Sequence, residues 1–283
     1  MDVWYEKLEQ VTFPTRTIPI SIDFAKSMVA AIKARKKGFD VPHVEVQQLQ
    51  AAIAEFGNAF VKLSSRSPKV GFCFALLFVV FDFFWKDATV AGERMRKIFD
   101  EEFAKCEEKD SNAIFMCLNV AHIKALCVSS VEECLCLLLA SERILDDLEL
   151  ALEDTNKWNQ KLVIRKWVCD LPLSAEFRGF VCNGTLTALS QYFAPCFFQE
   201  LQGKESDIEA KCKSLLEKIQ HLIPSSVVCD FAVLADRVLV IELNPFNDYE
   251  GCGTSSCMFD WKKDRLVLDG EKKEVRFCFS TKK

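Results

Sequence analysis

The stretch that decides the fold is residues 227–246, VVCDFAVLADRVLVIELNPF. Apolar residues, many of them β-branched or aromatic, flank the short polar sequence Ala235-Asp236-Arg237. This pattern is typical of two β-strands that turn back on each other, so we expect a hairpin here. Its few charged residues then need an explanation, because a carboxylate buried among apolar side chains is costly unless a cation pairs with it.

Three polar side chains of this hairpin could gather on one face of it. Asp230 lies in the first strand, and Glu242 and Asn244 lie at the end of the second. Alternate residues of a strand share a face, so Glu242 and Asn244 point the same way, and strand pairing could bring Asp230 to them. Two carboxylates and an amide oxygen are ligands that suit Mg²⁺ bridging nucleotide phosphates. The alternative is a purely structural role, in which the acidic residues lie at the ends of the strands and Asn244-Pro245 begins a turn.

The composition is that of a globular protein. The chain has 283 residues, enough for one large domain or two small ones, with half of the residues hydrophobic and 27% charged. A net charge of -5 gives no reason to expect a nucleic-acid partner. The apolar run 70–85 is shorter than the ~20 residues of a membrane span and contains Asp82, so no membrane partner is expected. We expect a monomer.

The chain is rich in cysteine, with fourteen residues of this type. Its first ten residues, MDVWYEKLEQ, do not resemble a signal peptide, so we expect reduced, mostly buried thiols and a cytoplasmic location. The close pairs Cys134/Cys136 and Cys252/Cys257 lack a matching second pair, and the chain has only three histidines. A zinc site is therefore not expected.

Helical patterns dominate before residue 160, and strand patterns dominate after it. We therefore predict an α+β fold with an N-terminal lobe, 1–160, and a C-terminal lobe, 161–283. Gly38 and Gly57 are predicted to end helices that begin at Ile22 and Val44. Asn183-Gly184 predicts a second hairpin, formed by 175–181 and 185–190.

Lys62 lies inside a short apolar strand predicted over 58–64. A lysine in such a strand usually belongs to a sheet edge or extends its charged end to solvent. The functional alternative is a positive charge that meets a phosphate group. The basic, hydroxyl-rich loop SSRSPK, residues 64–69, also suits phosphate.

Together these segments resemble the cell division cycle protein 123 family, also called the D123 family, over nearly the whole chain. The run RKW…EFRGFV…SQ…CDF…IELNPF carries the resemblance, and Phe60–Leu63 and Ser67–Lys69 precede it. The family's fold is an ATP-grasp, which is an α+β fold of two lobes with the nucleotide cleft between them. The resemblance therefore implies ATP and Mg²⁺ as cofactors.

The resemblance also implies a role for each matching residue. Lys62 would reach the α and β phosphates, Arg66 and Lys69 would flank them, and Asp87 would follow in the same motif. The adenine edge would meet the backbone of a hinge formed by Arg165, Lys166, Trp167 and Val168. Glu176 and Arg178 would line the cleft, with Arg178 suited to a forked contact with phosphate or carboxylate. Asp230, Glu242 and Asn244 would hold Mg²⁺.

Three features depart from the family pattern. Glu242 stands where better-known members have Asp, and Tyr192-Phe193 stands where the family often has Arg-Asp. Seventeen residues, 70–86, separate Ser67-Pro68-Lys69 from Asp87-Ala88, although the family motif is continuous there. Because deleting this Phe-rich block restores the motif, our hypothesis is that it is translated intron. A transcript that retains the block would rule the hypothesis out.

The resemblance implies ATP-dependent assembly of the heterotrimeric eukaryotic initiation factor two through binding of its gamma subunit. Nucleotide would then act as a ligand that orders the two lobes. One alternative is an active ATP-grasp ligase that joins a carboxylate, or a nucleic-acid end, to a nucleophile through a phosphorylated intermediate. Another is a degenerate module that binds a partner without nucleotide, which the changes at Tyr192 and Glu242 would permit.

Overall fold

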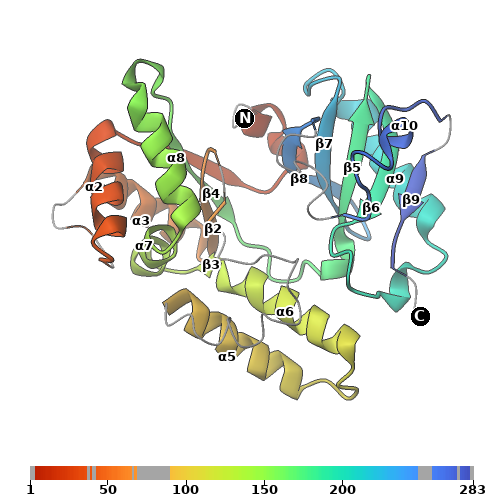
Figure 1. Ribbon diagram of the computed structural model, residues 1–283, viewed down its shortest axis with the longest axis horizontal. Coiled ribbons are helices and arrows are strands. Elements are labelled where there is room, and N and C mark those ends of the chain that lie inside the picture. The colour runs from red at the N-terminus through yellow and green to blue at the C-terminus, as the bar shows by residue number, and fades with distance from the viewer. Residues whose placement is uncertain are drawn as a thin grey trace. The chain divides into compact units, whose positions relative to one another are not determined.

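The computed structural model describes residues 4–36, 39, 43–65, 67–68, 90–247, 257–272 and 275–280. The chain divides into two compact units, each with its own β-sheet (Figure 1). Unit 1 comprises residues 1–13, 110–116 and 168–283, and unit 2 comprises residues 14–109 and 117–167. The α+β class predicted from the sequence is confirmed.

The sheet of unit 2 has four strands in the order β1-β4-β2-β3, and every neighbouring pair is antiparallel. The strands are β1 (Thr15–Pro19), β2 (Ala59–Leu63), β3 (Cys127–Val128) and β4 (Lys161–Lys166). β4 pairs with β1 on one side and with β2 on the other. Since β4 lies inside this sheet, the lobe boundary predicted after residue 160 moves to Trp167, and the first thirteen residues belong to the other unit.

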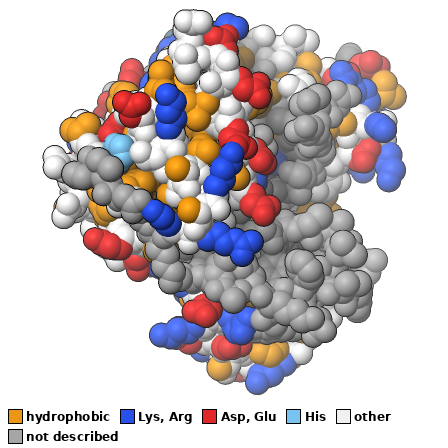
Figure 2. Space-filling view, turned by 60° about the vertical axis from the view of Figure 1, so that its left-hand side comes forward, with side chains coloured by type: hydrophobic (Ala, Val, Ile, Leu, Met, Phe, Trp, Pro, Cys, Tyr) orange, Lys and Arg blue, Asp and Glu red, His pale blue; other side chains and the backbone are white. Residues whose placement is uncertain are grey.

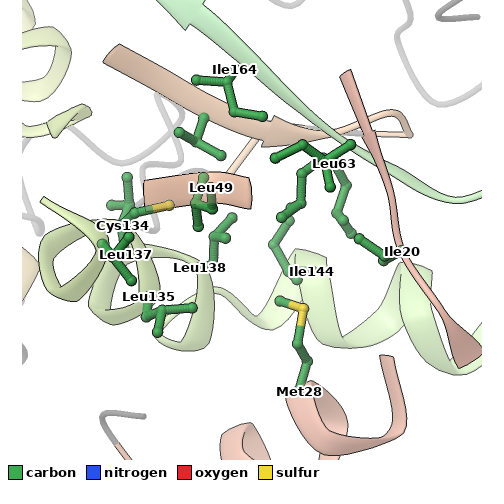
Figure 3. Packing of buried hydrophobic residues seen from close by; sticks show 14 of the residues in the cluster. Ile20, Met28, Leu49, Leu63, Cys134, Leu135, Leu137, Leu138, Ile144 and Ile164 are labelled. Carbon is green, nitrogen blue, oxygen red and sulfur yellow. The ribbon is translucent and has the colours of Figure 1, made fainter. Parts of the chain in front are cut away.

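One face of this sheet packs against helices. The helices that pack there are α2 (Ile22–Lys33), α3 (Val44–Phe56), α7 (Val131–Leu139) and α8 (Glu142–Glu153), which is followed by the short η3 (Thr155–Lys157). Two further helices, α5 (Val90–Ala104) and α6 (Ser111–Ala125), form a separate small apolar cluster. Alternate strand residues, among them Leu63 and Ile164, point toward Leu138 and Ile144 of the helices (Figure 3). Because β-strand side chains alternate between faces, the residues between them lie on the opposite face of the sheet.

The first long helix ends earlier than predicted. The sequence places its end at Gly38, whereas α2 ends at Lys33. Arg35 takes a positive φ of 51°, and the Lys36 N–H donates to the carbonyl oxygen of Ala31 at 2.9 Å. This left-handed residue closes the helix in the manner usual for glycine. The prediction was wrong because a non-glycine residue terminates the helix. The other helix behaves as predicted, with α3 ending before Gly57 at φ 74°.

The sheet of unit 1 has five strands in the order β8-β7-β5-β6-β9, of which only the β6–β9 pair is parallel. The strands are β5 (Glu176–Cys182), β6 (Thr185–Gln191), β7 (Val227–Val233), β8 (Val238–Pro245) and β9 (Arg276–Cys278). The helices described in this unit are α1 (Trp4–Lys7), η1 (Glu9–Val11), η4 (Leu173–Ala175), η5 (Gln199–Leu201), α9 (Glu205–Ile219) and α10 (Arg265–Leu268).

Both predicted hairpins are confirmed. Asn183 and Gly184 have φ angles of 50° and 78°, the two positive values that a tight type I′ turn requires between β5 and β6. β7 and β8 pair antiparallel from Val233 opposite Val238, and the Leu234 N–H donates to Arg237 O at 2.8 Å. The pairing is irregular after Asp230, where Ile241 is the additional residue of β8. This bulge lies beside the polar residues of the hairpin.

Gly179 in the middle of β5 has a packing reason to lack a side chain. A Cβ atom at this position would lie 2.7 Å from Cε2 of Phe231 and 3.0 Å from a methyl carbon of Leu186. Both neighbours belong to strands paired with β5 and are buried. The glycine therefore lets the Phe231 ring fill the space above β5.

The two faces of the unit 1 sheet are covered by different elements. α9 contacts β6, β7 and β8, and its Cys212 lies near Cys229 of β7. On the opposite face Phe180, Ala188 and Val228 form an apolar cluster with residues of the C-terminal segment, Phe259, Trp261, Val267 and Leu268. That cluster covers only part of the face. The remaining part carries the polar residues described in the next subsection.

Surface charges of both signs are mixed. Figure 2 brings forward the side of unit 2 that carries α2 and α8, and it shows Lys and Arg interspersed with Asp, Glu and apolar side chains. Within the described residues, every helix is too short or too polar to cross a lipid bilayer.

Candidate functional site

A buried ion pair lies at the centre of the polar part of the unit 1 sheet. Arg178 of β5 stands directly opposite Asp230 of β7. Its Nε donates to Oδ1 and its Nη2 donates to Oδ2 of that carboxylate, both at 2.7 Å. Arg178 is 5% exposed and Asp230 is 2% exposed. Burial opposes the charge of the guanidinium, but the adjacent carboxylate outweighs it and holds the pKa of Arg178 above its ordinary value. The forked geometry fixes both groups.

This pair answers the question that the sequence raised about Asp230. A buried carboxylate there requires a cation, and the structure supplies one in Arg178. The sequence predicted Arg178 in the nucleotide cleft with a forked contact to phosphate or carboxylate, and its forked contact is with Asp230. The burial of Asp230 alone is therefore no longer an argument for a metal ion.

The other two predicted metal ligands share the face of Asp230. Glu242 stands opposite Asp230 and Asn244 stands opposite Val228, so strand pairing brings the three residues together as expected. The Asn244 amide nitrogen donates to Asp230 Oδ2 at 3.4 Å. Asp230 is buried, whereas Glu242 and Asn244, on an edge strand, are partly exposed.

This donor set fits Mg²⁺ in its chemistry. Its carboxylate and amide oxygens are hard ligands, and Mg²⁺ commonly binds through one or two carboxylates while keeping waters. A carboxylate has about four acceptor positions, and Arg178 uses two of those on Asp230. Among the described residues, no three His, Cys, Asp or Glu side chains form a metal-binding group, so the Asn244 amide oxygen would have to complete the set.

Two further residues border the ion pair. The ring of Tyr192 lies against the Arg178 guanidinium, with Cζ 4.8 Å from the ring centroid. The Tyr192 N–H donates to Glu176 O at 2.9 Å. Burial raises the pKa of Glu176 to about 8, the negative charge of Asp230 adds to the rise, and Arg178 opposes it. Near pH 7 the Glu176 carboxyl is therefore mostly protonated.

In unit 2 Lys62, predicted to contact phosphate, and Arg165, predicted as part of the hinge, lie on the sheet face away from the helices. Lys62 stands opposite Val163, and Arg165 stands opposite Phe60, so both cations are on the same face and two positions apart. Each is 6% exposed. β2 has neighbours on both sides, so the edge-strand interpretation of Lys62 is wrong. A face with two buried cations suits anionic groups, either carboxylates of the chain or phosphates.

The predicted hinge follows β4, and two of its backbone donors are already used. The Lys166 N–H donates to Pro14 O at 2.8 Å, and the Trp167 N–H donates to Asn58 O at 2.9 Å. An adenine ring would have to use other backbone groups of this stretch, such as those of Val168, whose side chain is exposed. Arg66, Lys69, Asp87 and the block 70–86 lie outside the described residues.

Ser190 and Gln191 belong to the family motif, but the sequence predicted no task for them. The Gln191 side chain donates to the carbonyl oxygens of Phe193 and Cys196 at 2.7 Å and accepts from the Ser280 N–H at 2.8 Å. The Ser190 hydroxyl accepts from the Met258 N–H at 3.0 Å. Both side chains are buried. Ser190, opposite Arg178, lies on the polar face, whereas Gln191, opposite Phe177, lies on the other face of the sheet. Both hold the C-terminal segment, and Gln191 also holds the loop after β6, a role that only long-range contacts reveal.

Comparison with known proteins finds a family match over residues 111–281, and the family is described as D123. A Schizosaccharomyces pombe protein named translation initiation factor eIF2 assembly protein is 26% identical over 160 residues, which are 52% of this chain and 48% of that protein. A Xenopus laevis protein of the same name is 30% identical over 112 residues, 38% of this chain and 31% of that protein. The matched segments thus span half or less of these relatives.

A solved structure has the same fold. The structure of Cdc123 from Schizosaccharomyces pombe aligns with a TM-score of 0.66 at 21% identity, covering 97% of this chain and 92% of that one.

Removing the cation of the buried pair should destabilise the protein strongly. Arg178→Met leaves Asp230 buried without its partner, so the free energy of unfolding should fall by about 3–5 kcal/mol. The double variant Arg178→Met/Asp230→Leu should recover most of this loss, since neither member of the pair then leaves a buried charge without its partner. Urea denaturation followed by circular dichroism measures both. The control is Arg16→Met, which breaks an exposed forked pair with Glu55 and should cost less than about 1 kcal/mol. Equal losses for Arg178→Met and Arg16→Met would contradict the assignment.

Glu176 should make stability depend on pH. Its pKa is about 8 in the folded chain against an ordinary value of 4.5, so between these values the unfolded state loses a proton that the folded state keeps. Stability should therefore fall as pH rises from about 5 to 8, by up to about 1.4 kcal/mol per pH unit from this group. Glu176→Gln removes the titration, and its stability relative to the parent should rise over that interval. Denaturation midpoints at several pH values test this, and a difference that stays constant with pH would refute it.

Proposed function

This chain belongs to the D123 family, and we propose that it is an ATP- and Mg²⁺-binding assembly factor for eukaryotic translation initiation factor 2, acting through the gamma subunit of that heterotrimer. The observation that carries the proposal is the family match over residues 111–281, which contains every residue of the polar face. Two relatives are named eIF2 assembly proteins. The fold, shared with a Cdc123 structure, supports the same family role.

The polar face of unit 1 supports the metal part of the proposal. Asp230, Glu242 and Asn244 would hold Mg²⁺, which neutralises phosphate oxygens when it is bound. Arg178 holds the Asp230 carboxylate in one orientation through two hydrogen bonds, so the ligand is positioned before a metal arrives. Glu176, mostly protonated near pH 7, adds little negative charge to this face.

The sheet of unit 2 supports the nucleotide part. Lys62 and Arg165 place two positive charges on one face of two adjacent strands, at a position where burial strengthens their attraction for anions. Phosphate groups of ATP would meet these charges. Since these strands also anchor the helix-packed core, the two cations are held on a rigid support.

In this function the nucleotide acts as a ligand. A molecule that binds only the folded, ordered chain stabilises it by mass action, by about 2.7 kcal/mol at a hundred times its dissociation constant. The bound state would then present the surface that the gamma subunit recognises. This scheme asks the site residues to position phosphates and metal, and it requires no bond of ATP to break.

ATP with Mg²⁺ should raise the melting temperature of the purified chain, and ATP with EDTA should raise it less. Glu242→Gln removes a charged metal ligand while leaving the Arg178–Asp230 pair intact, so it should shrink the Mg²⁺-dependent part of the shift. The matched control is Glu217→Gln, an exposed glutamate on α9, which should keep the full shift. No shift in the parent chain would refute nucleotide binding. A full shift in Glu242→Gln would contradict the assignment of Glu242 as a metal ligand.

The tagged chain should capture the purified gamma subunit of initiation factor 2, and capture should be stronger with ATP and Mg²⁺ than without. The isolated alpha and beta subunits serve as controls and should stay unbound. Glu242→Gln should weaken capture to the extent that it weakens the nucleotide shift, whereas Glu217→Gln should not. Failure to capture the gamma subunit, in a chain that does bind ATP and Mg²⁺, would refute the partner while leaving the nucleotide site intact.

A further inference from the structure

Two cysteines of unit 2 hold their sulfur atoms in contact. Cys106 lies in the connection between α5 and α6, and Cys117 lies on α6. Their Sγ atoms are 3.5 Å apart, and both thiols are free. A disulfide requires about 2.0 Å between the sulfurs, so the two atoms need to approach by only about 1.5 Å. Cys106 lies in a loop, and loops generally adjust more readily than helices.

The two thiols differ in accessibility. Cys106 is partly exposed, whereas Cys117 is buried in the small apolar cluster that joins α5 to α6. Burial raises the pKa of Cys117 to about 12, and the hydrogen bond and the charge of Cys106 add to the rise. The charge of Glu102 adds to this rise in the pKa of Cys117, and that of Lys105 opposes it.

The helical hairpin around these thiols is held by a small apolar cluster. Its buried members are Met95, Phe99, Cys117, Ala121 and Ala125, and partly buried Ile98, Phe103 and Leu118 pack against them. Cys106 packs against this cluster at the end where the chain turns from α5 to α6. A covalent link at that point would close a short loop and restrain the unfolded hairpin more than the folded one.

We propose that Cys106 and Cys117 form a thiol-oxidation site, at which a small disulfide such as oxidised glutathione converts the two thiols into one reversible intramolecular disulfide. The site is independent of the nucleotide and metal residues. It rests on the 3.5 Å contact and on the unequal exposure of the two sulfurs.

The reaction proceeds in two exchanges. The Cys106 thiolate attacks one sulfur of oxidised glutathione, forms a mixed disulfide and releases one glutathione thiolate. Cys117 then loses its proton to solvent and attacks Cys106 Sγ, which expels the second glutathione thiolate. Two electrons pass from the protein to glutathione, and the two protons lost by the cysteines end on two glutathione thiols. Reduced glutathione in excess reverses both steps. Attachment of glutathione to Cys106 also removes the thiol that raises the pKa of Cys117, which favours the second step.

The test equilibrates the whole chain in buffers of reduced and oxidised glutathione, alkylates the remaining thiols and maps the peptides by mass spectrometry. We expect a Cys106–Cys117 crosslink that appears before other cysteines react and that disappears on reduction. Cys117→Ser should give a chain with one glutathione on Cys106. Cys106→Ser should lower modification of Cys117 by about tenfold or more, because the buried thiol lacks access.

Cys182→Ser is the matched control, since Cys182 is partly exposed at the end of β5 and should leave the crosslink unchanged. Circular dichroism tests whether each variant is folded. If a variant does not fold, the presence or absence of the crosslink in the parent chain still tests the proposal. The proposal is overturned if Cys106 and Cys117 both remain reduced, and so react with the alkylating reagent, under conditions in which Cys182 already carries glutathione. It is also overturned if Cys106 forms its disulfide with a different cysteine.

Discussion

The forked ion pair between Arg178 and Asp230 is the constraint on which the polar face of unit 1 depends. Two opposite charges that are almost fully shielded from water tolerate little misalignment, because each would lose the forked contact that compensates its charge. β5 and β7 must therefore pair with these two residues directly opposite each other. A slip of one residue would turn Arg178 and Asp230 to opposite faces of the sheet, and the positions of Glu176, Glu242 and Asn244 would change with them.

The same face shows how an apolar core and a polar site share one sheet. Phe180, Ala188 and Val228 are covered by the segment from Phe259 to Leu268, and the polar residues begin one pleat further along the same strands. Ser190, opposite Arg178, connects this face to the C-terminal segment, because its hydroxyl accepts from the Met258 N–H. Gln191, on the other face, binds the backbone of the loop after β6 and of the C-terminal segment. The packing that stabilises unit 1 is thus also what holds the polar side chains in place.

The sequence predicted what local chemistry determines. Asn183-Gly184 and the apolar runs around Asp236 predicted both hairpins, and strand alternation placed Glu242 and Asn244 on one face. The bulge at Ile241 places Glu242 opposite Asp230, because regular pairing from Val233 and Val238 would put Ile241 there. What the sequence could not predict depends on partners far away in the chain. Arg178 and Asp230 are 52 residues apart, and β4 is a central strand only because β1 and β2 enclose it. For the same reason the sequence left the edge-strand alternative open for Lys62, since a strand's own residues do not reveal its neighbours. The roles of Lys62, Arg165 and Glu176 toward ATP stay predictions.

Charge balance within the proposed site favours one order of binding. Arg178 cancels the charge of Asp230, and Glu176 is mostly neutral near pH 7, so Glu242 provides most of the net negative charge that a metal would meet on this face. A single carboxylate on an edge strand, partly exposed to water, attracts a strongly hydrated Mg²⁺ only weakly. The phosphates of ATP would bring the remaining negative charge. We therefore expect Mg²⁺ to enter as the ATP complex, so that the replacement of the usual Asp by Glu at position 242 acts on nucleotide affinity and metal affinity together.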